Sequence, residues 1–207
     1  MHLVDDYIVK EEYGAKWLKI FDHNSTGGVF FNSSEEVLFS LNESKYSIIK
    51  YLPKIVKYDD NFYEFMLEYP ALKGMNRWKQ SMSPLNVKYG TEEYKKIIYE
   101  AINITWDGDG YFGSLVKTTQ SSALFSAIKA PLWYFAIGAY TYWWSADSFP
   151  GASSYSESSG VGTKFVVKRA VLWIRVPQFS MMFKSMCSCS RNNYGNILLC
   201  VCVLFIS

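Results

Sequence analysis

Residues 61–70, NFYEFMLEYP, constrain the fold more than any other segment because their character alternates. The apolar positions are Tyr63, Phe65, Leu67 and Tyr69. Between them lie Glu64, Met66 and Glu68. A period of two puts the first set on one face of a β-strand and the second set on the opposite face. The segment therefore predicts a strand with one buried and one partly solvated face, ended by Pro70.

Other short segments rich in strand-forming residues are separated by turn-prone sequences. They span residues 16–21, 76–82, 100–106, 113–118, 132–139 and 164–176. We expect the first to place Trp17, Lys19 and Phe21 on one face and to end at the turn-prone DHNSTGG. Lys168 and Arg169 interrupt the last segment, which predicts a bend or a bulge at that point.

A few segments have helical features. Ser33 followed by Glu36 has the spacing of a capping box and predicts a helix over residues 33–42. Residues 44–55 show helical spacing limited by Pro53, and residues 91–100 form another short helix or run into the next strand. Because helices and strands do not alternate, the fold class is all-β. We expect an antiparallel β-sandwich or jelly roll with two or three short helices in its connections.

The chain has 207 residues, of which 49% are hydrophobic and 19% charged, and this composition supports one well-buried domain. Composition changes after Val176. We therefore divide the chain into a polar lead-in at 1–15, a β-sandwich module at 16–176 and a cysteine-containing apolar tail at 177–207. The net charge of +2 provides no basic field for phosphates, which argues against nucleic-acid binding.

Two features bear on location. The first residues contain no apolar run, so they do not form a secretory signal peptide. The cysteines all lie in the tail: Cys187, Cys189, Cys200 and Cys202. The module then forms no internal disulfide, which suits a reducing, cytoplasmic environment. Under that expectation the glycosylation-type triplets are chance matches, at Asn24, Asn32, Asn42 and Asn103.

Several segments occur in an order that resembles a β-sandwich module expanded in trichomonad-type protists and also seen in some invertebrate proteins. They are WLKIFDHNSTGGVFF, KYSIIKYL, FYEFMLEYP, NRWKQSMSPLN, GSLVKTT, LWYFAIGAY, FPG and AVLWIRV. The resemblance covers roughly residues 17–176. It implies a concanavalin-like or jelly-roll sandwich and no particular activity. Members of that family end soon after the last of these segments, whereas this chain continues into its tail.

Residues suited to nucleophilic catalysis are scarce. The histidines are His2, in the lead-in, and His23, which we expect to cap the backbone of a turn beside Asp22. Neither a nucleophile elbow nor a phosphate-binding glycine loop occurs, and nothing indicates a cofactor.

Metal-binding patterns are incomplete. Asp107 and Asp109 have the opening spacing of a calcium loop, but the closing glutamate is missing, so a plain turn is favoured. The C-x-C, ten residues, C-x-C pattern of the tail could be written as a four-thiolate zinc site. The apolar neighbours of Cys200 and Cys202 favour burial or membrane contact instead, and we predict no metal.

The carboxylates allow one enzyme hypothesis. Sandwich-fold β-glucanases have an E-x-D-x-E strand, and here Glu64 and Glu68 occupy its outer positions with Met66 in place of the aspartate. Glutamates four positions apart on a strand have Cα atoms roughly 13 Å apart. The missing aspartate removes a group that tunes its neighbours. A glycoside hydrolase is one alternative function, and a solvated strand face explains the same residues.

Residues 131–144, PLWYFAIGAYTYWW, contain seven aromatic residues in fourteen positions. On a strand, Trp133, Phe135 and Ile137 share one face, and both faces are apolar, so we expect most of these rings in the core. Gly138 allows either a bend or the close approach of another backbone segment.

Tryptophans expected on loops predict a ligand-binding surface, because an indole stacks on a sugar while polar side chains bind its hydroxyl groups. The stacking candidates are Trp78, Trp106, Trp143 and Trp144. The polar candidates are Asn76, Arg77, Gln80, Asp107 and Asp109. The sequence thus predicts a non-catalytic recognition module with a glycan as its partner. A protein-interaction or scaffold module without a small ligand is the other alternative.

The apolar run at 197–206 has ten residues, whereas a membrane-spanning helix needs about 20. We expect the tail to lack a fixed structure. Peripheral membrane contact through 197–206, helped by palmitoylation, is an alternative, and an edge strand is another.

Overall fold

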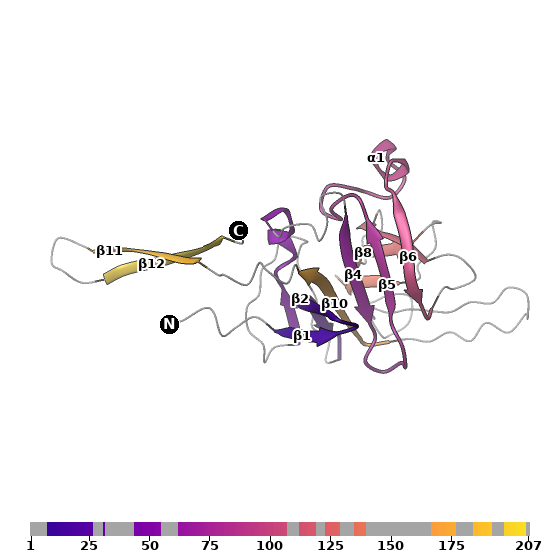
Figure 1. Cartoon of the computed structure of the whole chain (residues 1–207), viewed down its shortest axis with the longest axis horizontal. Helices are drawn as coiled ribbons and strands as arrows, with labels where there is room; N and C mark the ends of the chain where they lie inside the picture. Colours follow the sequence, from indigo (N-terminus) through magenta and orange to yellow (C-terminus); the bar gives the residue numbers. More distant parts are fainter. Residues whose placement is uncertain are drawn as a thin grey trace, which may run out of the picture.

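The structure is a computed structural model that describes residues 8–26, 31, 44–54, 62–106, 112–118, 123–128, 135–139, 167–176, 184–191 and 197–205. In the last two ranges only the backbone is described. Every pair of named strands in this part of the chain is antiparallel. The predicted all-β fold class is therefore confirmed (Figure 1).

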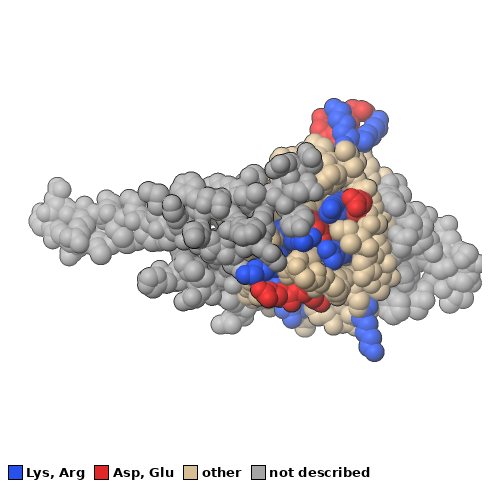
Figure 2. Space-filling model, in the orientation of Figure 1, with Lys and Arg blue, Asp and Glu red and all other residues tan. Residues whose placement is uncertain are grey.

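The larger sheet has seven strands in the order β1-β2-β10-β4-β5-β6, and β3 also pairs with β2. The strands are β1 (Val9–Glu12), β2 (Ala15–Asn24), β3 (Lys45–Ser47), β4 (Tyr63–Glu68), β5 (Asn76–Gln80), β6 (Tyr99–Ile104) and β10 (Arg169–Val176). In the same orientation, Figure 2 shows acidic and basic side chains next to one another on the face turned to the viewer.

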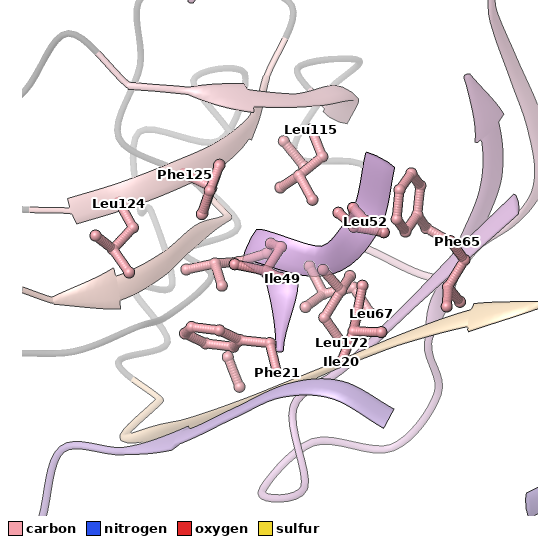
Figure 3. Close-up of a cluster of buried hydrophobic side chains, with 14 of the residues drawn as sticks. Ile20, Phe21, Ile49, Leu52, Phe65, Leu67, Leu115, Leu124, Phe125 and Leu172 are labelled. Atoms are coloured by element: carbon pink, nitrogen blue, oxygen red, sulfur yellow. The ribbon is translucent and has the colours of Figure 1, made fainter. Parts of the chain in front are cut away.

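The smaller sheet has the order β7-β8-β9 and lies against the other face of the larger one, as a sandwich requires. Its strands are β7 (Phe112–Lys117), β8 (Ala123–Ile128) and β9 (Ala136–Ala139). Leu115 and Phe125 of this sheet face Leu172 of the larger sheet across one continuous apolar core (Figure 3). We call the face of the larger sheet that contacts this core the inner face, and the opposite one the outer face.

Helices are short and lie in connections, as predicted. Residues 49–54 form the 3-10 helix η2 (Ile49–Lys54), which places Ile49 and Leu52 in the core between the sheets (Figure 3). The predicted longer helix at 44–55 is wrong at its start, because residues 45–47 pair with β2 as β3. Residues 91–100 follow both expectations: α1 (Glu92–Lys95), capped by Thr91, is followed after residues 96–98 by β6. The helix predicted at 33–42 lies outside the described residues.

A bulge in β2 corrects the expected faces of this strand. Leu172 of β10 pairs with Phe21 and Trp173 pairs with Lys19, so Ile20 is an extra residue in the ladder. Both Ile20 and Phe21 are therefore buried in the inner core, and Phe21 does not share a face with Lys19. The strand also continues through His23, which is buried beside Phe31 and is not a turn residue.

The alternation of β4 is confirmed. Tyr63, Phe65 and Leu67 belong to the inner core, and Met66 belongs to a separate cluster on the outer face. The outer face is less solvated than the pattern predicted, because Glu64 is fully buried. This burial places a charged group inside the fold, where it needs partners.

The aromatic segment at 131–144 enters the described structure as Phe135 and β9. Phe135 and Ile137 are buried in the same core, as predicted. Gly138 has φ of 73°, and a Cβ at this position would lie 2.6 Å from Leu124 Cδ1. The neighbour of this glycine is thus a side chain, whereas we expected a bend or the close approach of backbone, and the positive φ is a conformation that glycine adopts readily. Trp133 lies outside the described residues.

The ends of the module differ from the prediction. The lead-in contributes β1, which pairs with β2, so the sheet begins at Val9. The strand predicted from residue 164 starts as β10 at Arg169, and the backbone bends at Lys168, close to the expected interruption.

The tail contains a hairpin where we expected no fixed structure. Strands β11 (Lys184–Arg191) and β12 (Ile197–Phe205) pair with each other and form a separate two-stranded sheet, apart from the sandwich in Figure 1. Among the described residues, no helix has the length and apolar character to cross a bilayer.

Candidate functional site

The outer face of the larger sheet holds a second cluster of buried apolar residues, separate from the main core. Its members are Ala15, Trp17, Met66, Met75, Val171 and Trp173. Acidic and basic side chains of β1, β2, β4, β5 and β10 lie among them (Figure 2). Within the described residues we take this face as the candidate for recognition, because ordered charges cover its buried apolar cluster and an exposed ring lies at its edge.

Glu64 of β4 lies at the centre of this face between two arginines. Arg77 of β5 donates from Nε to Oε1 over 2.6 Å, and Arg175 of β10 donates from Nη1 to Oε2 over 2.9 Å. The neighbouring strands place these side chains beside Glu64 because β4 pairs with β5 on one side and with β10 on the other. Each carboxylate oxygen thus has a charged donor, which compensates for its burial.

Glu68, on the same strand, is held in a similar way. Lys10 of β1 donates to Oε1, and the indole of Trp173 donates from Nε1 to Oε2 over 2.7 Å. The Lys10 ammonium also lies 4.4 Å from the centre of the Trp173 ring, and Lys19 lies 5.6 Å from it. Two ammonium groups close to an indole stabilise its position.

Asp22 of β2 is a third carboxylate held by hydrogen bonds from neighbouring side chains. Arg169 makes two parallel hydrogen bonds to it, of 2.9 Å and 2.7 Å, and Lys19 donates over 2.9 Å. Burial raises the pKa of Asp22, but the hydrogen bonds and charges of Arg169 and Lys19 outweigh burial, so the pKa falls below its ordinary value of 3.8.

We expect Asp22→Asn to lower the free energy of unfolding at neutral pH and to have little effect in acid. A carboxyl whose pKa is lowered by folding stabilises the fold above its unfolded pKa, and this contribution is lost as the pH falls through the folded pKa. The difference between wild type and variant should be constant above about pH 5 and shrink below 3.8. Urea unfolding at several pH values measures it, and a difference independent of pH would contradict the prediction.

The turn between β1 and β2 brings an exposed ring to the edge of this face. Tyr13 and Gly14 connect the paired residues Glu12 and Ala15, with φ of 53° and 67°. A two-residue turn with both φ values positive favours Asn-Gly, and a tyrosine at its first position is strained. Tyr13 is nevertheless 51% exposed. Strain of this kind at an exposed side chain points to a function.

Arg77 connects this turn to the charged centre. Its guanidinium lies 5.8 Å from the Tyr13 ring centre and 5.2 Å from that of Trp17. Trp17 in turn donates from Nε1 to the backbone oxygen of Glu12 over 3.0 Å, which fixes the turn. Desolvation and a hydrogen bond with Glu12 raise the pKa of Tyr13.

A shallow, open pocket of about 370 Å³ surrounds the turn. It is lined by Glu11, Glu12, Tyr13, Gly14, Ala15 and Lys16. An aromatic ring, two carboxylates and an ammonium group therefore border one hollow, a combination that suits a ligand with an apolar ring face and polar edges.

The geometry does not favour the glycoside hydrolase. The four oxygens of Glu64 and Glu68 all accept hydrogen bonds from protein donors. A hydrolase needs a carboxyl that can exchange a proton with substrate and another that reaches the sugar. The solvated strand face offered as the plain explanation of these residues is also wrong, because Glu64 is fully buried.

Trp78 and Gln80, predicted to bind a ligand, are internal. Trp78 is fully buried between Phe65 and Phe112, with ring centres 5.5 Å and 5.1 Å away. Its Nε1 donates to Gln80 Oε1 over 2.9 Å, and the same amide makes hydrogen bonds to the backbone of Leu115. Both residues point to the inner face because β5 alternates, so they join the two sheets and cannot touch a ligand.

Asn76 and Trp106 hold each other. The Asn76 amide donates to the Trp106 backbone oxygen over 2.7 Å and accepts from its backbone N–H over 2.8 Å. Trp106 is half-buried against Tyr69, with ring centres 5.3 Å apart. The amide of Asn76 is thus used by the backbone of Trp106, and this pair of hydrogen bonds connects β5 to the end of β6.

Of the predicted site residues, Arg77 is placed on the outer face, beside the strained turn. Trp143, Trp144, Asp107 and Asp109 lie outside the described residues. Sequence reasoning missed Tyr13, although EEYGAKW contains the signal: a two-residue turn ending in glycine between two segments that can pair. The division of the chain at residue 15 separated the two strands that this turn connects, so the hairpin was not predicted.

No group of three or more potential metal ligands occurs among the residues whose side chains are described. Comparison of the chain with protein-family models, curated proteins and solved structures finds no match. The resemblance to the protist module stays an expectation, and the case for a function rests on the geometry of the outer face.

Proposed function

We propose that this protein is a non-catalytic recognition module that binds a carbohydrate at the β1–β2 turn. The observation that supports it is Tyr13, an exposed ring held in a strained left-handed conformation at the mouth of a pocket. Natural turns avoid this conformation for tyrosine, so the ring serves something other than the fold. A sugar ring stacks on such a phenol through its apolar face.

Charged groups around the ring supply hydrogen bonds to sugar hydroxyls. Glu12 and Lys16 line the pocket, and Lys16 lies 3.6 Å from the carboxylate of Glu11. Arg77 stands behind the ring and is fixed by Glu64, so it needs no reordering on binding. A preformed arrangement loses less conformational entropy when the ligand binds.

A pair of variants at Tyr13 tests the proposal. Tyr13→Ala should weaken binding on a glycan array by about tenfold, since an aromatic contact contributes about 0.5–1.5 kcal/mol. Tyr51→Ala is the matched control because Tyr51, on η2, is also exposed. Equal glycan binding by wild type and Tyr13→Ala, or an array without signal, would overturn the proposal.

Tyr13→Asn separates binding from folding. Asparagine adopts the left-handed conformation readily, so this variant should raise the free energy of unfolding by about 1 kcal/mol while glycan binding falls as in Tyr13→Ala. Chemical denaturation measures the first effect and the array the second. Loss of stability would show that the phenol contributes more to packing than the backbone strain removes.

The outer strand β6 supports the second candidate, a protein-interaction module. Within the described sheet β6 lies at the edge. Ile102 of this strand is 39% exposed, and Ile98, just before the strand, is 61% exposed. An edge with exposed isoleucines can accept a strand from a partner. Ile102→Lys should then abolish a complex isolated by pull-down and leave glycan binding unchanged.

A further inference from the structure

The hairpin of β11 and β12 brings the four cysteines together in pairs. Cys187 is directly opposite Cys202, and Cys189 is directly opposite Cys200. Only Ser188 and its partner Val201 separate the two pairs. The spacing of the sequence does not determine this register, because a shift by one residue would have placed each cysteine opposite a different residue type.

This register puts all four positions on one face of the hairpin. Directly opposite residues of an antiparallel pair share a face, and so do residues two apart on one strand. Opposed Cα atoms lie about 4.5–5.5 Å apart and those two apart about 7 Å apart. Four residues in such a rectangle are spaced so that a four-thiolate site, with sulfur–metal bonds of about 2.3 Å, is compatible with the backbone register.

The composition of the two strands supports a thiolate site. Neither KSMCSCSR nor ILLCVCVLF contains histidine, aspartate or glutamate, so sulfur is the only strong side-chain ligand that they offer. Lys184 and Arg191 lie at the two ends of β11. Their two positive charges equal in size the net negative charge of a zinc tetrathiolate.

We propose that the hairpin binds one thiophilic metal ion, with zinc as the ion of choice, through Cys187, Cys189, Cys200 and Cys202. Binding converts four thiols to thiolates, forms four zinc–sulfur bonds and releases four protons, which leaves the unit with a charge of −2. No oxidant is involved. The site is structural, since four protein ligands leave no open position for substrate.

Zinc titration of the reduced, metal-free full chain against a chromophoric chelator tests the proposal. We expect one zinc ion per chain, with release of protons, and visible absorption of a tetrahedral thiolate complex when cobalt replaces zinc. Cys189→Ser should weaken zinc binding by more than about 100-fold. Loss of a residue that only hydrogen-bonds to a metal ligand weakens binding by up to about 100-fold, and loss of a ligand itself should cost more. Ser188→Ala, between the cysteines, is the control and should bind zinc like wild type.

The double variant Ser188→Cys, Cys189→Ser tests the register itself. It keeps four cysteines but moves one of them to the opposite face, so zinc affinity should fall as far as in Cys189→Ser. Zinc binding equal to wild type would show a flexible tail collecting any four thiols, and it would overturn the proposal. So would Cys187–Cys202 and Cys189–Cys200 disulfides, mapped by mass spectrometry after oxidation, in a reduced chain that binds no zinc.

Discussion

Glu64→Gln should lower the free energy of unfolding by about 3–5 kcal/mol, the usual result of removing one member of a buried ion pair. Glutamine keeps the size of the side chain but removes the negative charge that Arg77 and Arg175 share. The side chains of these arginines are only 16% and 20% exposed, so water compensates only in part for the lost carboxylate. Urea or guanidinium unfolding at neutral pH measures the change.

The same substitution at Glu92 provides the control. Glu92 pairs with Lys95 over 2.6 Å on α1, but both side chains are mostly exposed, so Glu92→Gln should cost less than about 1 kcal/mol. Equal costs for the two variants would mean that Glu64 is solvated. If Glu64→Gln is as destabilising as expected, removing all three charges together should recover part of the loss, because no unpaired charge then remains inside.

Trp78→Ala should be similarly destabilising, by about 3–5 kcal/mol, because it leaves a large cavity in the core. The indole contacts Phe65 on β4 and Phe112 on β7, and so connects the two sheets. Its Nε1 also donates a hydrogen bond to Gln80 Oε1. Loss of the ring therefore removes contacts on both layers of the sandwich. Denaturant unfolding and near-ultraviolet circular dichroism measure the loss.

Trp106→Ala is the matched comparison. Trp106 is half-buried, and Asn76 binds its backbone, so those two hydrogen bonds survive the substitution. We expect a clearly smaller cost than for Trp78→Ala. A stable Trp78→Ala variant that had lost ligand binding would contradict the burial of Trp78 and return it to the recognition surface.

The two variants also separate the two roles that a tryptophan can have in this protein. The sequence predicts the same stacking role for Trp78 and Trp106, because both are next to polar residues that can bind sugar hydroxyls. The structure uses those polar residues internally: Gln80 joins β5 to β7, and Asn76 joins β5 to the end of β6. Polar side chains next to an aromatic residue are therefore weak evidence for a ligand when the strand can bury both.

The outer face differs from an ordinary solvated sheet face in one respect that matters for function. Glu64, Glu68 and Asp22 are each held by two side chains that donate to them, so these charges are fixed before any ligand arrives. At the β1–β2 turn this ordered network meets an exposed ring and an open pocket. Preorganised polar groups beside an accessible aromatic ring favour recognition over catalysis.

Local pattern was enough for the class of the fold and for the faces of β4. A period of two depends only on backbone geometry, so Tyr63, Phe65 and Leu67 had to lie together whatever the strand paired with. These features are encoded by neighbouring residues, and no distant contact was needed to decide them.

Strand pairing decided the features that local pattern did not predict. The bulge that turns Phe21 inward depends on which residues of β10 lie opposite β2, and the burial of Glu64 depends on arginines from the two strands beside it. The opposed cysteines of the hairpin are likewise a matter of register. Pairing joins segments far apart in the chain through long-range packing, which no local spacing encodes. The sequence alone therefore determined an all-β chain with alternating strands, and only the tertiary structure decided which polar residues became internal and which reached the surface.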